Sequence, residues 1–302
     1  MTAQRPPGEP TPTQADATQG NPVRREMAVG AGVALLRVQR VSGEQRSVLD
    51  DAVAVEEPLE IRLAGETVAV TMRTPGHDHE LVLGFLLAEG IVRSRDEVGG
   101  IAHCGRPGES GNVIDVSSAP GHVIDWEPEG AMRRATLITS ACGVCGRRSI
   151  DDLLARVGEV RDDARFTARW IARLTEQLVP RQANFAASGG VHAAALWDSS
   201  GQPYVLREDV GRHNAVDKVM GRAALDGRLP ATGMTLVVSG RASFELVQKA
   251  AVARVAMLVS VSAPSSLAVA AAQRSGITLV GFARGERFNV YAGEHRITGL
   301  AQ

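Results

Sequence analysis

The chain has 302 residues and a formal net charge of −1, because 33 basic side chains nearly balance 34 acidic ones. Such a balance is not typical of proteins that bind nucleic acid or membrane surfaces through bulk charge, so local arginines would have to hold an anionic ligand. Three cysteines are too few for a disulfide framework, and no stretch approaches the ~20 apolar residues that span a bilayer. These features favour the reducing cytoplasm and predict neither a nucleic-acid nor a membrane partner.

Residues 1–26 are rich in Pro, Thr, Gln and Gly and have scarcely any large apolar side chain, so we expect a disordered leader. Arg24 and Arg25, followed by the apolar run from Met27 to Leu36, superficially resemble a twin-arginine export signal. Glu26 interrupts that pattern, Arg37 follows the run at once, and no small-residue cleavage site closes it. The segment is therefore interpreted as a linker into the first strand.

Residues 27–140 predict a smaller, β-rich α+β region. Two alternating runs between Glu60 and Met72 flank Ala64-Gly65-Glu66, which is typical of a hairpin. A helix is predicted from His77 to Glu89, with Gly90 placed to end it. Short β-like runs follow at 113–116, 123–126 and 135–139.

Residues 141–302 predict an α/β domain that begins with a CxxC loop. Helical patterns occupy 150–157 and 167–178, and beyond Phe185 strands alternate with helices, which favours parallel pairing with crossover helices. The predicted strands are 191–197, 204–206, 234–239, 257–262 and 277–282, and the predicted helices are 213–222, 244–254 and 267–274. Three strand ends open into Ser239-Gly240-Arg241, Ser262-Ala263-Pro264 and Ala283-Arg284-Gly285. Ligands of open α/β sheets bind beyond such ends.

Cys142 and Cys145 form the CxxC pair, between a predicted strand and a predicted helix. Gly143 and Gly146 give the loop freedom, while Arg147, Arg148 and the helix N-terminus would favour the thiolate form. A thiolate on such a loop can accept sulfur as a persulfide. The neighbouring thiol can then attack that persulfide, leaving a disulfide and expelling sulfide.

Three other interpretations of the pair remain open. Two buried structural cysteines are one, although the glycine-rich flanks disfavour burial. A structural zinc site could recruit Cys104 and His103, but the two halves lack a familiar spacing. A thioredoxin-like redox pair usually lies near a first βαβ unit, whereas this pair follows a β-rich region.

A zinc deaminase is excluded, even though His192-Ala193-Ala194 and a CxxC are both present. The catalytic glutamate of that signature is missing at Ala194, no proline precedes Cys142, and the CxxC comes before the histidine. We therefore predict no metal bound directly by the protein.

Three further segments could contact a ligand. The segment from Arg207 to Lys218 offers close backbone approach and several donors, or it is a surface helix start capped by Asp209. Ser239, Arg241 and Ser243 follow a strand end, where free helix N–H groups could receive phosphate or where Ser243 simply caps a helix. The turn from Phe282 to Arg287 offers an aromatic face, two guanidinium groups and a carboxylate for a guanine nucleotide, or it is a solvated tight turn.

These motifs occur together, and in this order, in what resembles the formate dehydrogenase accessory sulfurtransferase family. The resemblance covers residues 34–297 and depends on five segments, which are 141–146, 189–194, 207–218, 239–249 and 280–287. Five matches in order are far more specific than a lone CxxC.

The resemblance implies a three-layer α/β/α, cytidine-deaminase-like main domain with a smaller N-terminal α+β domain. It implies a cytoplasmic homodimer that accepts persulfide sulfur from a cysteine desulfurase. The sulfur passes to the molybdenum bis(molybdopterin guanine dinucleotide) cofactor, which is bound as substrate and destined for a formate dehydrogenase apoenzyme.

Carried onto this chain, the resemblance makes Cys142 the persulfide-bearing residue and Cys145 its partner. The expected contacts of the guanine-nucleotide end are Phe282, Ala283, Arg284, Gly285, Glu286 and Arg287, with His192, Asp209, Arg212, His213, Ser239 and Arg241. Several relatives have cysteine or another residue at the place of Ala283. Because this chain has alanine there, a third catalytic thiol at this turn is excluded.

Two functions from other classes compete with sulfur transfer. A non-catalytic chaperone would bind the nucleotide cofactor and present it to the apoenzyme without needing either cysteine. A dithiol oxidoreductase would instead cycle a disulfide between Cys142 and Cys145.

Overall fold

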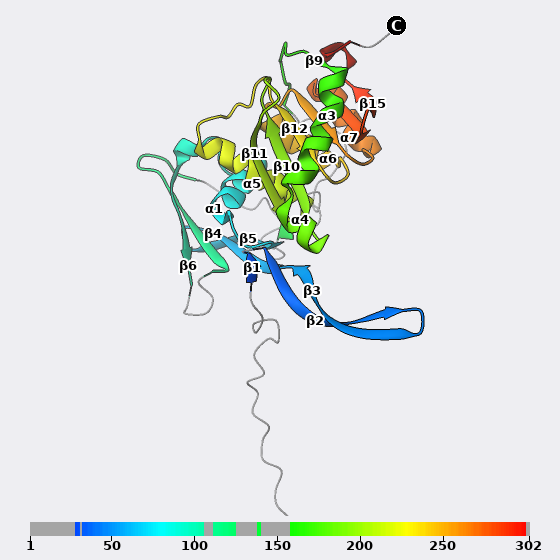
Figure 1. Ribbon diagram of the computed structural model, residues 1–302. Helices are drawn as coiled ribbons and strands as arrows, with labels where there is room; N and C mark the ends of the chain where they lie inside the picture. The colour runs from blue at the N-terminus through cyan, green and yellow to red at the C-terminus, as the bar shows by residue number, and fades with distance from the viewer. Residues whose placement is uncertain (1–27, 31, 106–110, 125–137, 140–157, 300–302) are drawn as a thin grey trace, which may run out of the picture.

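The computed structural model describes residues 28–30, 32–105, 111–124, 138–139 and 158–299, and in these ranges the chain is a mixed α/β protein with several β-sheets (Figure 1). The predicted leader, the predicted helix at 150–157 and the thiols of Cys142 and Cys145 lie outside the described residues. No helix within these ranges is long and apolar enough to cross a membrane.

The smaller of the two main sheets is built from residues 57–139, with the strand order β6-β7-β4-β5-β8. Its strands are β4 (Glu57–Leu63), β5 (Glu66–Arg73), β6 (Val98–Cys104), β7 (Val113–Ser118) and β8 (Ile138–Thr139). The predicted hairpin is confirmed: β4 and β5 are antiparallel, and Ala64 and Gly65 turn the chain at φ 49° and 88°. The predicted β-run at 123–126 is wrong at Val123 and Ile124, which lie in no strand.

The helix predicted from His77 to Glu89 is confirmed as α1 (Asp78–Ala88), and it covers this smaller sheet. Leu81, Leu83 and Leu86 are buried in one apolar cluster with Leu59 and Ile61 of β4. The helix ends where Gly90 takes up a left-handed φ of 71°, which a glycine adopts without steric cost.

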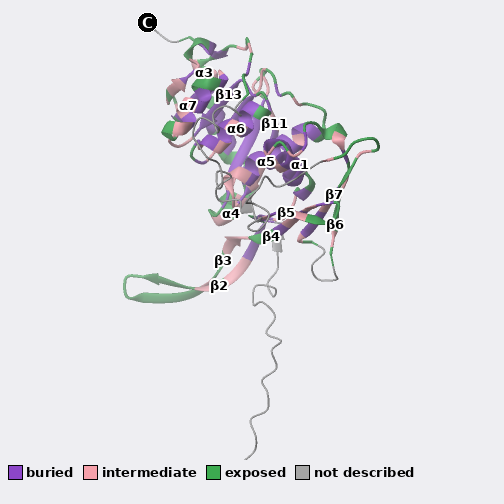
Figure 2. Cartoon of the chain, turned by 180° about the vertical axis from the view of Figure 1, so that it is seen from behind, coloured by how far each residue is buried: buried purple, intermediate pink, exposed green. Residues whose placement is uncertain are grey.

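A long β-hairpin projects from the body of the molecule and was not predicted beyond a first strand. It consists of β2 (Val33–Ser42) and β3 (Gln45–Ala54), with the short β1 (Ala28–Gly30) paired to the base of β2. The two strands leave the body together (Figure 1), and they are exposed toward their tip (Figure 2). Few of their side chains are buried, so the sequence carries no clear inside–outside alternation here.

The larger sheet has six strands in the order β11-β10-β12-β13-β14-β15. They are β10 (His192–Trp197), β11 (Pro203–Asp209), β12 (Thr235–Val238), β13 (Met257–Ser260), β14 (Thr278–Arg284) and β15 (Arg287–Ala292). Parallel pairing is correct for β12, β13 and β14 and wrong for β10 and β11, which pair antiparallel. Strand β15 was not predicted, and it pairs antiparallel with β14. A short turn joins β10 to β11, and another joins β14 to β15; neither leaves room for the crossover that parallel neighbours require.

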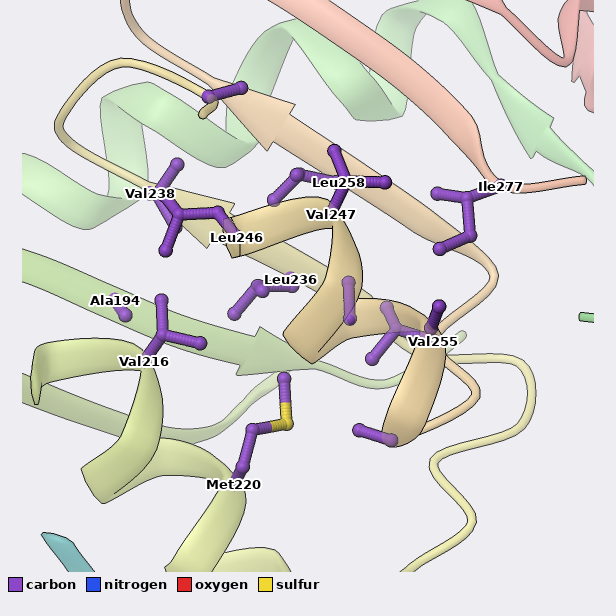
Figure 3. Close-up of a cluster of buried hydrophobic side chains, with 14 of the residues drawn as sticks. Ala194, Val216, Met220, Leu236, Val238, Leu246, Val247, Val255, Leu258 and Ile277 are labelled. Atoms are coloured by element: carbon purple, nitrogen blue, oxygen red, sulfur yellow. The ribbon is translucent and has the colours of Figure 1, made fainter. Parts of the chain in front are cut away.

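Helices cover both faces of the larger sheet. Helix α3 (Ala168–Leu178) packs on one face, and α5 (Arg212–Leu225), α6 (Phe244–Val252) and α7 (Ser266–Ser275) pack on the other. Figure 3 shows the second face, where Val216 and Met220 of α5 and Leu246 of α6 meet Leu236 and Val238 of β12. The mixed α/β class is thereby confirmed, while the finer likeness to cytidine deaminases stays a prediction.

Smaller elements complete the described ranges. They are β9 (Phe166–Thr167), which pairs in parallel with β16 (Ile297–Thr298), the short α4 (Ala183–Ser188), and the 3-10 turns η2 (Arg95–Glu97), η4 (Val179–Arg181) and η5 (Glu294–Arg296).

Helices α1 and α5 touch backbone to backbone, and two glycines make this possible. A Cβ at Gly84 would lie 1.9 Å from the carbonyl oxygen of Asp217, and one at Gly221 would lie 1.8 Å from that of Glu80. No side-chain rearrangement can relieve a clash with a main-chain oxygen. The smaller sheet, through α1, is thus pressed against the helix that also covers the larger sheet.

Gly221→Ala should lower the free energy of unfolding by about 1–3 kcal/mol, because the two helices must move apart. The loss should appear even though alanine favours helix over glycine by about 1 kcal/mol. Urea unfolding measures it. Gly158→Ala is the matched control, since a Cβ there meets nothing within 4 Å; equal stability of the two variants would contradict the close-packing argument.

Candidate functional site

The sequence-predicted ligand residues converge at one end of the larger sheet. The parallel strands β12, β13 and β14 finish there, and we name it the carboxyl end of the sheet. Antiparallel pairing brings the start of β10 to the same end, where His192 lies opposite Asp209. It also brings the start of β15, where Arg287 lies opposite Arg284. Segments almost 100 residues apart in the sequence therefore share one face.

Backbone contacts fix the loops at this end to each other. The N–H of Ser239 donates to the carbonyl of Ala193 at 2.9 Å, and the N–H of Phe282 donates to the carbonyl of Ser262 at 3.1 Å. The Ser239 hydroxyl accepts from the N–H of Ala193 at 2.9 Å. The Ser239 side chain therefore connects the end of β12 to β10. It was predicted to contact the ligand, and the structure shows it in a positioning role instead.

Arg212 and His192 lie together over Gly240. A Cβ at Gly240 would be 3.3 Å from His192 Nδ1 and 3.4 Å from Arg212 Cδ, so the glycine lets both side chains approach the main chain closely. The Nε of Arg212 is buried and has no hydrogen-bond partner among the described residues. A buried donor without a partner is unfavourable by about 1–3 kcal/mol, so a bound anion would be stabilising here.

The surroundings of His192 favour its neutral form. Burial lowers the pKa of His192, and the positive charges of Arg212 and His213 lower it further, against the opposite effect of Asp209. A neutral imidazole keeps one nitrogen as an acceptor and adds no positive charge beside Arg212.

His213 contacts α6 in a way that the sequence did not indicate. Its Nε2 lies 3.2 Å from Ser243 Oγ and 3.0 Å from Glu245 Oε2. Ser243 occupies the N-cap position of α6, as predicted, but its side chain makes no cap hydrogen bond. Hydrogen bonding from His213 lowers the pKa of Glu245, although burial opposes this. Glu245 was missed because acidic residues are common in first helical turns.

Asp209 is fully buried rather than exposed to the carboxyl end of the sheet. One carboxylate oxygen accepts from Lys218 Nζ at 2.7 Å and from the N–H of Thr74 at 3.1 Å. The other accepts from the N–H of Gly211 at 2.8 Å and from Asn214 Nδ2 at 3.1 Å. Burial raises the pKa of Asp209, and the Lys218 ammonium opposes that rise. Four donors already occupy this carboxylate.

The segment from Arg207 to Lys218 joins the two main sheets. Arg207 donates to both oxygens of Glu80 in α1, at 2.6 and 2.8 Å. Asn214 donates to the carbonyl of Met72 in β5 at 2.7 Å. The sequence predicted either a ligand site or the start of a surface helix for this segment. It did not predict the buried connection between the two sheets that the structure shows. Charged residues inside the apolar run of α5 were the available signal.

The turn from Phe282 to Arg287 is the end of the β14–β15 hairpin. Phe282 adopts a left-handed φ of 53°, unusual for an aromatic residue, and its side chain is 47 % exposed. Ala283 is buried, whereas Arg284, Glu286 and Arg287 are exposed. Arg241, after β12, is also exposed. An exposed aromatic face with nearby guanidinium groups suits stacking on a base and binding of phosphate.

The last described residue before the predicted thiols is Thr139, at the end of β8. It lies opposite Val70 of β5 in a parallel pair. The next residues of β5 reach the start of α5, since Thr71 Oγ1 contacts Asn214 Oδ1 at 3.3 Å. The chain thus leaves the smaller sheet beside the elements that carry Arg212 and His213.

The larger sheet and its carboxyl end define an α/β protein with histidine and arginine side chains gathered at one end of the sheet. No group of three or more His, Cys, Asp or Glu residues within the described ranges is arranged to hold a metal ion. The chain belongs to the FdhD/NarQ family, whose model matches residues 54–298.

Similar proteins agree with this family over most of the chain. A sulfur carrier protein FdhD from Anaeromyxobacter sp. (strain K) is 51% identical over 284 residues, which cover 91% of this chain and 97% of that protein. One from Mycobacterium tuberculosis (strain ATCC 25618 / H37Rv) is 47% identical, covering 89% of this chain and 100% of that protein. A crystal structure assigned as a formate dehydrogenase accessory protein, from Desulfotalea psychrophila, superposes with a TM-score of 0.69 at 26% identity, covering 88% of this chain and 100% of that one.

Glu80→Gln should remove a pH-dependent part of the stability. Burial alone would raise the pKa of Glu80, but Arg207 and His77 lower it from 4.5 to about 2. A depressed carboxyl pKa stabilises the fold above the unfolded value near 4.5 and loses that contribution as the pH falls toward 2. Wild type should exceed E80Q by on the order of 2–3 kcal/mol at neutral pH, with more than half of this difference gone by about pH 3. A difference that does not change with pH in urea unfolding would contradict the assignment.

His192 should titrate below the ordinary histidine range, which proton NMR of the ring Cε1–H resonance measures directly. Arg212→Gln should raise its pKa, because one of the positive charges that oppose protonation is removed. Arg274→Gln, an exposed arginine at the end of α7, is the control and should leave it unchanged. If the pKa of His192 is the same in R212Q as in the wild type, the charge of Arg212 does not act on the His192 ring, and the prediction is contradicted.

Proposed function

We propose that this chain is a sulfurtransferase for formate dehydrogenase maturation. Cys142 accepts sulfur as a persulfide from a cysteine desulfurase, with Cys145 as its partner. The sulfur passes to the molybdenum bis(molybdopterin guanine dinucleotide) cofactor, which is substrate and cargo for the formate dehydrogenase apoenzyme. The proposal includes a cytoplasmic homodimer and a deaminase-like main domain.

One observation carries the proposal: basic and aromatic groups that suit a guanine diphosphate gather at a single end of the larger sheet. Phe282, Arg284 and Arg287 supply one part, and Arg212, with its unpartnered Nε, supplies another. Family membership and relatives named as sulfur carriers add the sulfur chemistry. The position of Thr139 supports access of the thiol segment, since Cys142 follows only three residues later.

The chemistry balances without a metal bound by the protein. The Cys142 thiolate attacks the outer sulfur of the desulfurase persulfide; a new S–S bond forms, the old one breaks, and the desulfurase thiolate leaves. On delivery, the Cys145 thiolate attacks the inner sulfur of Cys142, forms a disulfide and releases the outer sulfur as sulfide to the cofactor. A dithiol reductant then restores both thiols for the next cycle.

Incubation with a cysteine desulfurase and cysteine should add about 32 Da, one sulfur atom, to the peptide that contains Cys142. Peptide mass spectrometry without a reducing agent measures the gain. Cys142→Ala should abolish it. Cys104→Ala is the matched control, because Cys104 lies on β6 of the smaller sheet and should not carry the sulfur.

Binding of guanosine diphosphate tests the other half of the proposal separately. Arg284→Gln with Arg287→Gln should weaken nucleotide binding about ten-fold or more while the persulfide still forms, since each guanidinium loses a charge-assisted contact. Arg274→Gln should leave both readouts unchanged. Sulfur labelling that persists in C142A would end the assignment of the carrier residue, and full rescue of formate dehydrogenase by a chain lacking both thiols would favour a chaperone.

A further inference from the structure

A cavity of about 540 Å³ lies at the end of α5 opposite to Arg212. It is enclosed by the ends of α1, α5 and α6 and by the loops at 93–96 and 227–230. Helix α5 has 14 residues, so at 1.5 Å per residue its ends are about 20 Å apart. The cavity is thus separate from the carboxyl end of the sheet, and none of the described residues that were predicted to contact the nucleotide lines it.

Apolar side chains form part of the lining of this cavity. Leu87, Met220 and Leu229 line it, and Leu225 and Val252 remain 37% and 43% exposed. Its volume falls in the range of small-molecule pockets, about 300–1,000 Å³. Apolar side chains around a hollow of this size can bury an apolar ligand, which is favourable by about 25 cal/mol per Å².

Positively charged side chains also line the cavity. Arg93, Arg95 and Arg254 line the cavity together with Lys249, and Asp96 is the one acidic residue among the described residues that line it. The guanidinium groups of Arg93 and Arg254 have no hydrogen bond or ion pair with any described residue, and Arg95 donates only to the carbonyl of Val98. Their charge is therefore available to an incoming anion.

The backbone of Arg254 adds an independent observation. It follows α6 with a left-handed φ of 55°, a position where glycine or asparagine is usual. Any side chain with a Cβ is strained there relative to glycine, yet Arg254 carries a guanidinium to the wall of the cavity. Strain retained beside a cavity is typical of a ligand site.

We propose that this cavity binds a small amphiphilic anion, with an apolar body among α1, α5 and α6 and a carboxylate, sulfonate or phosphate among the three arginines. The site is independent of the sulfur-transfer function.

Titration of the full chain with 8-anilinonaphthalene-1-sulfonate, followed by fluorescence, tests the proposal. We expect saturable binding of one molecule per chain and displacement by dodecanoate. Dodecyltrimethylammonium, which has the same chain with a cationic head, should compete about ten-fold more weakly or worse. This comparison separates recognition of the anion from general affinity for an apolar chain.

Val252 offers a matched pair of variants, because it lines the cavity and is exposed enough to change without disturbing the core. Val252→Glu should weaken binding about ten-fold or more, and Val252→Lys should not. Arg93→Gln with Arg254→Gln should weaken it similarly, with unchanged thermal unfolding. Absence of saturable binding, or equal affinity in V252E, V252K and the double arginine variant, would overturn the proposal, because the probe would then be bound elsewhere.

Discussion

The buried ion pair between Asp209 and Lys218 is the interaction on which the arrangement of the two main sheets depends. Charges removed from water are unfavourable unless each is fully hydrogen-bonded, and here the carboxylate accepts from four donors, one at Thr74 and three within residues 211–218. Lys218 also donates to the carbonyl of Thr74 at 2.7 Å. Loss of one member would leave the others buried without partners, so the network acts as a unit. It ties the end of β5 to β11 and α5.

That network also determines where the ligand-facing groups lie. Arg212 follows Asp209 by only three residues, at the first turn of α5, so the ion pair sets the start of the helix and the direction of its side chains. The glycine contact between α1 and α5 fixes the other helix against it. Both constraints lie behind the carboxyl end of the sheet rather than in it. The segment from Arg207 to Lys218 therefore has two roles. Its buried residues, such as Asp209 and Lys218, fix the start of α5, whereas Arg212 and His213 lie at the carboxyl end of the sheet.

Local patterns explain which parts of the fold could be predicted. The apolar runs of β12 and β13 indicated strands covered on both faces, and Thr167 marked the start of α3, where its hydroxyl accepts from the N–H of Trp170. The antiparallel pairing of β10 with β12 and the contact of Thr74 with Asp209 depend on residues far apart in sequence. Nothing in a local pattern specifies such partners. For the same reason the sequence could not distinguish Arg212, which lies at the carboxyl end of the sheet, from Asp209, which is fully buried.

Electrostatics at the carboxyl end of the sheet favour a bound anion beside Arg212 and His192. The buried Nε of Arg212 has no partner in the part of the chain that the structure describes, and its unfavourable energy in the free protein would be recovered when an anion binds. A neutral His192 beside it can orient such an anion without competing for it. Because the sheet and the ion-pair network already fix both groups, little ordering remains to oppose binding there. Under the proposed function, the nucleotide arm is then the stationary partner, and the persulfide must be carried to it.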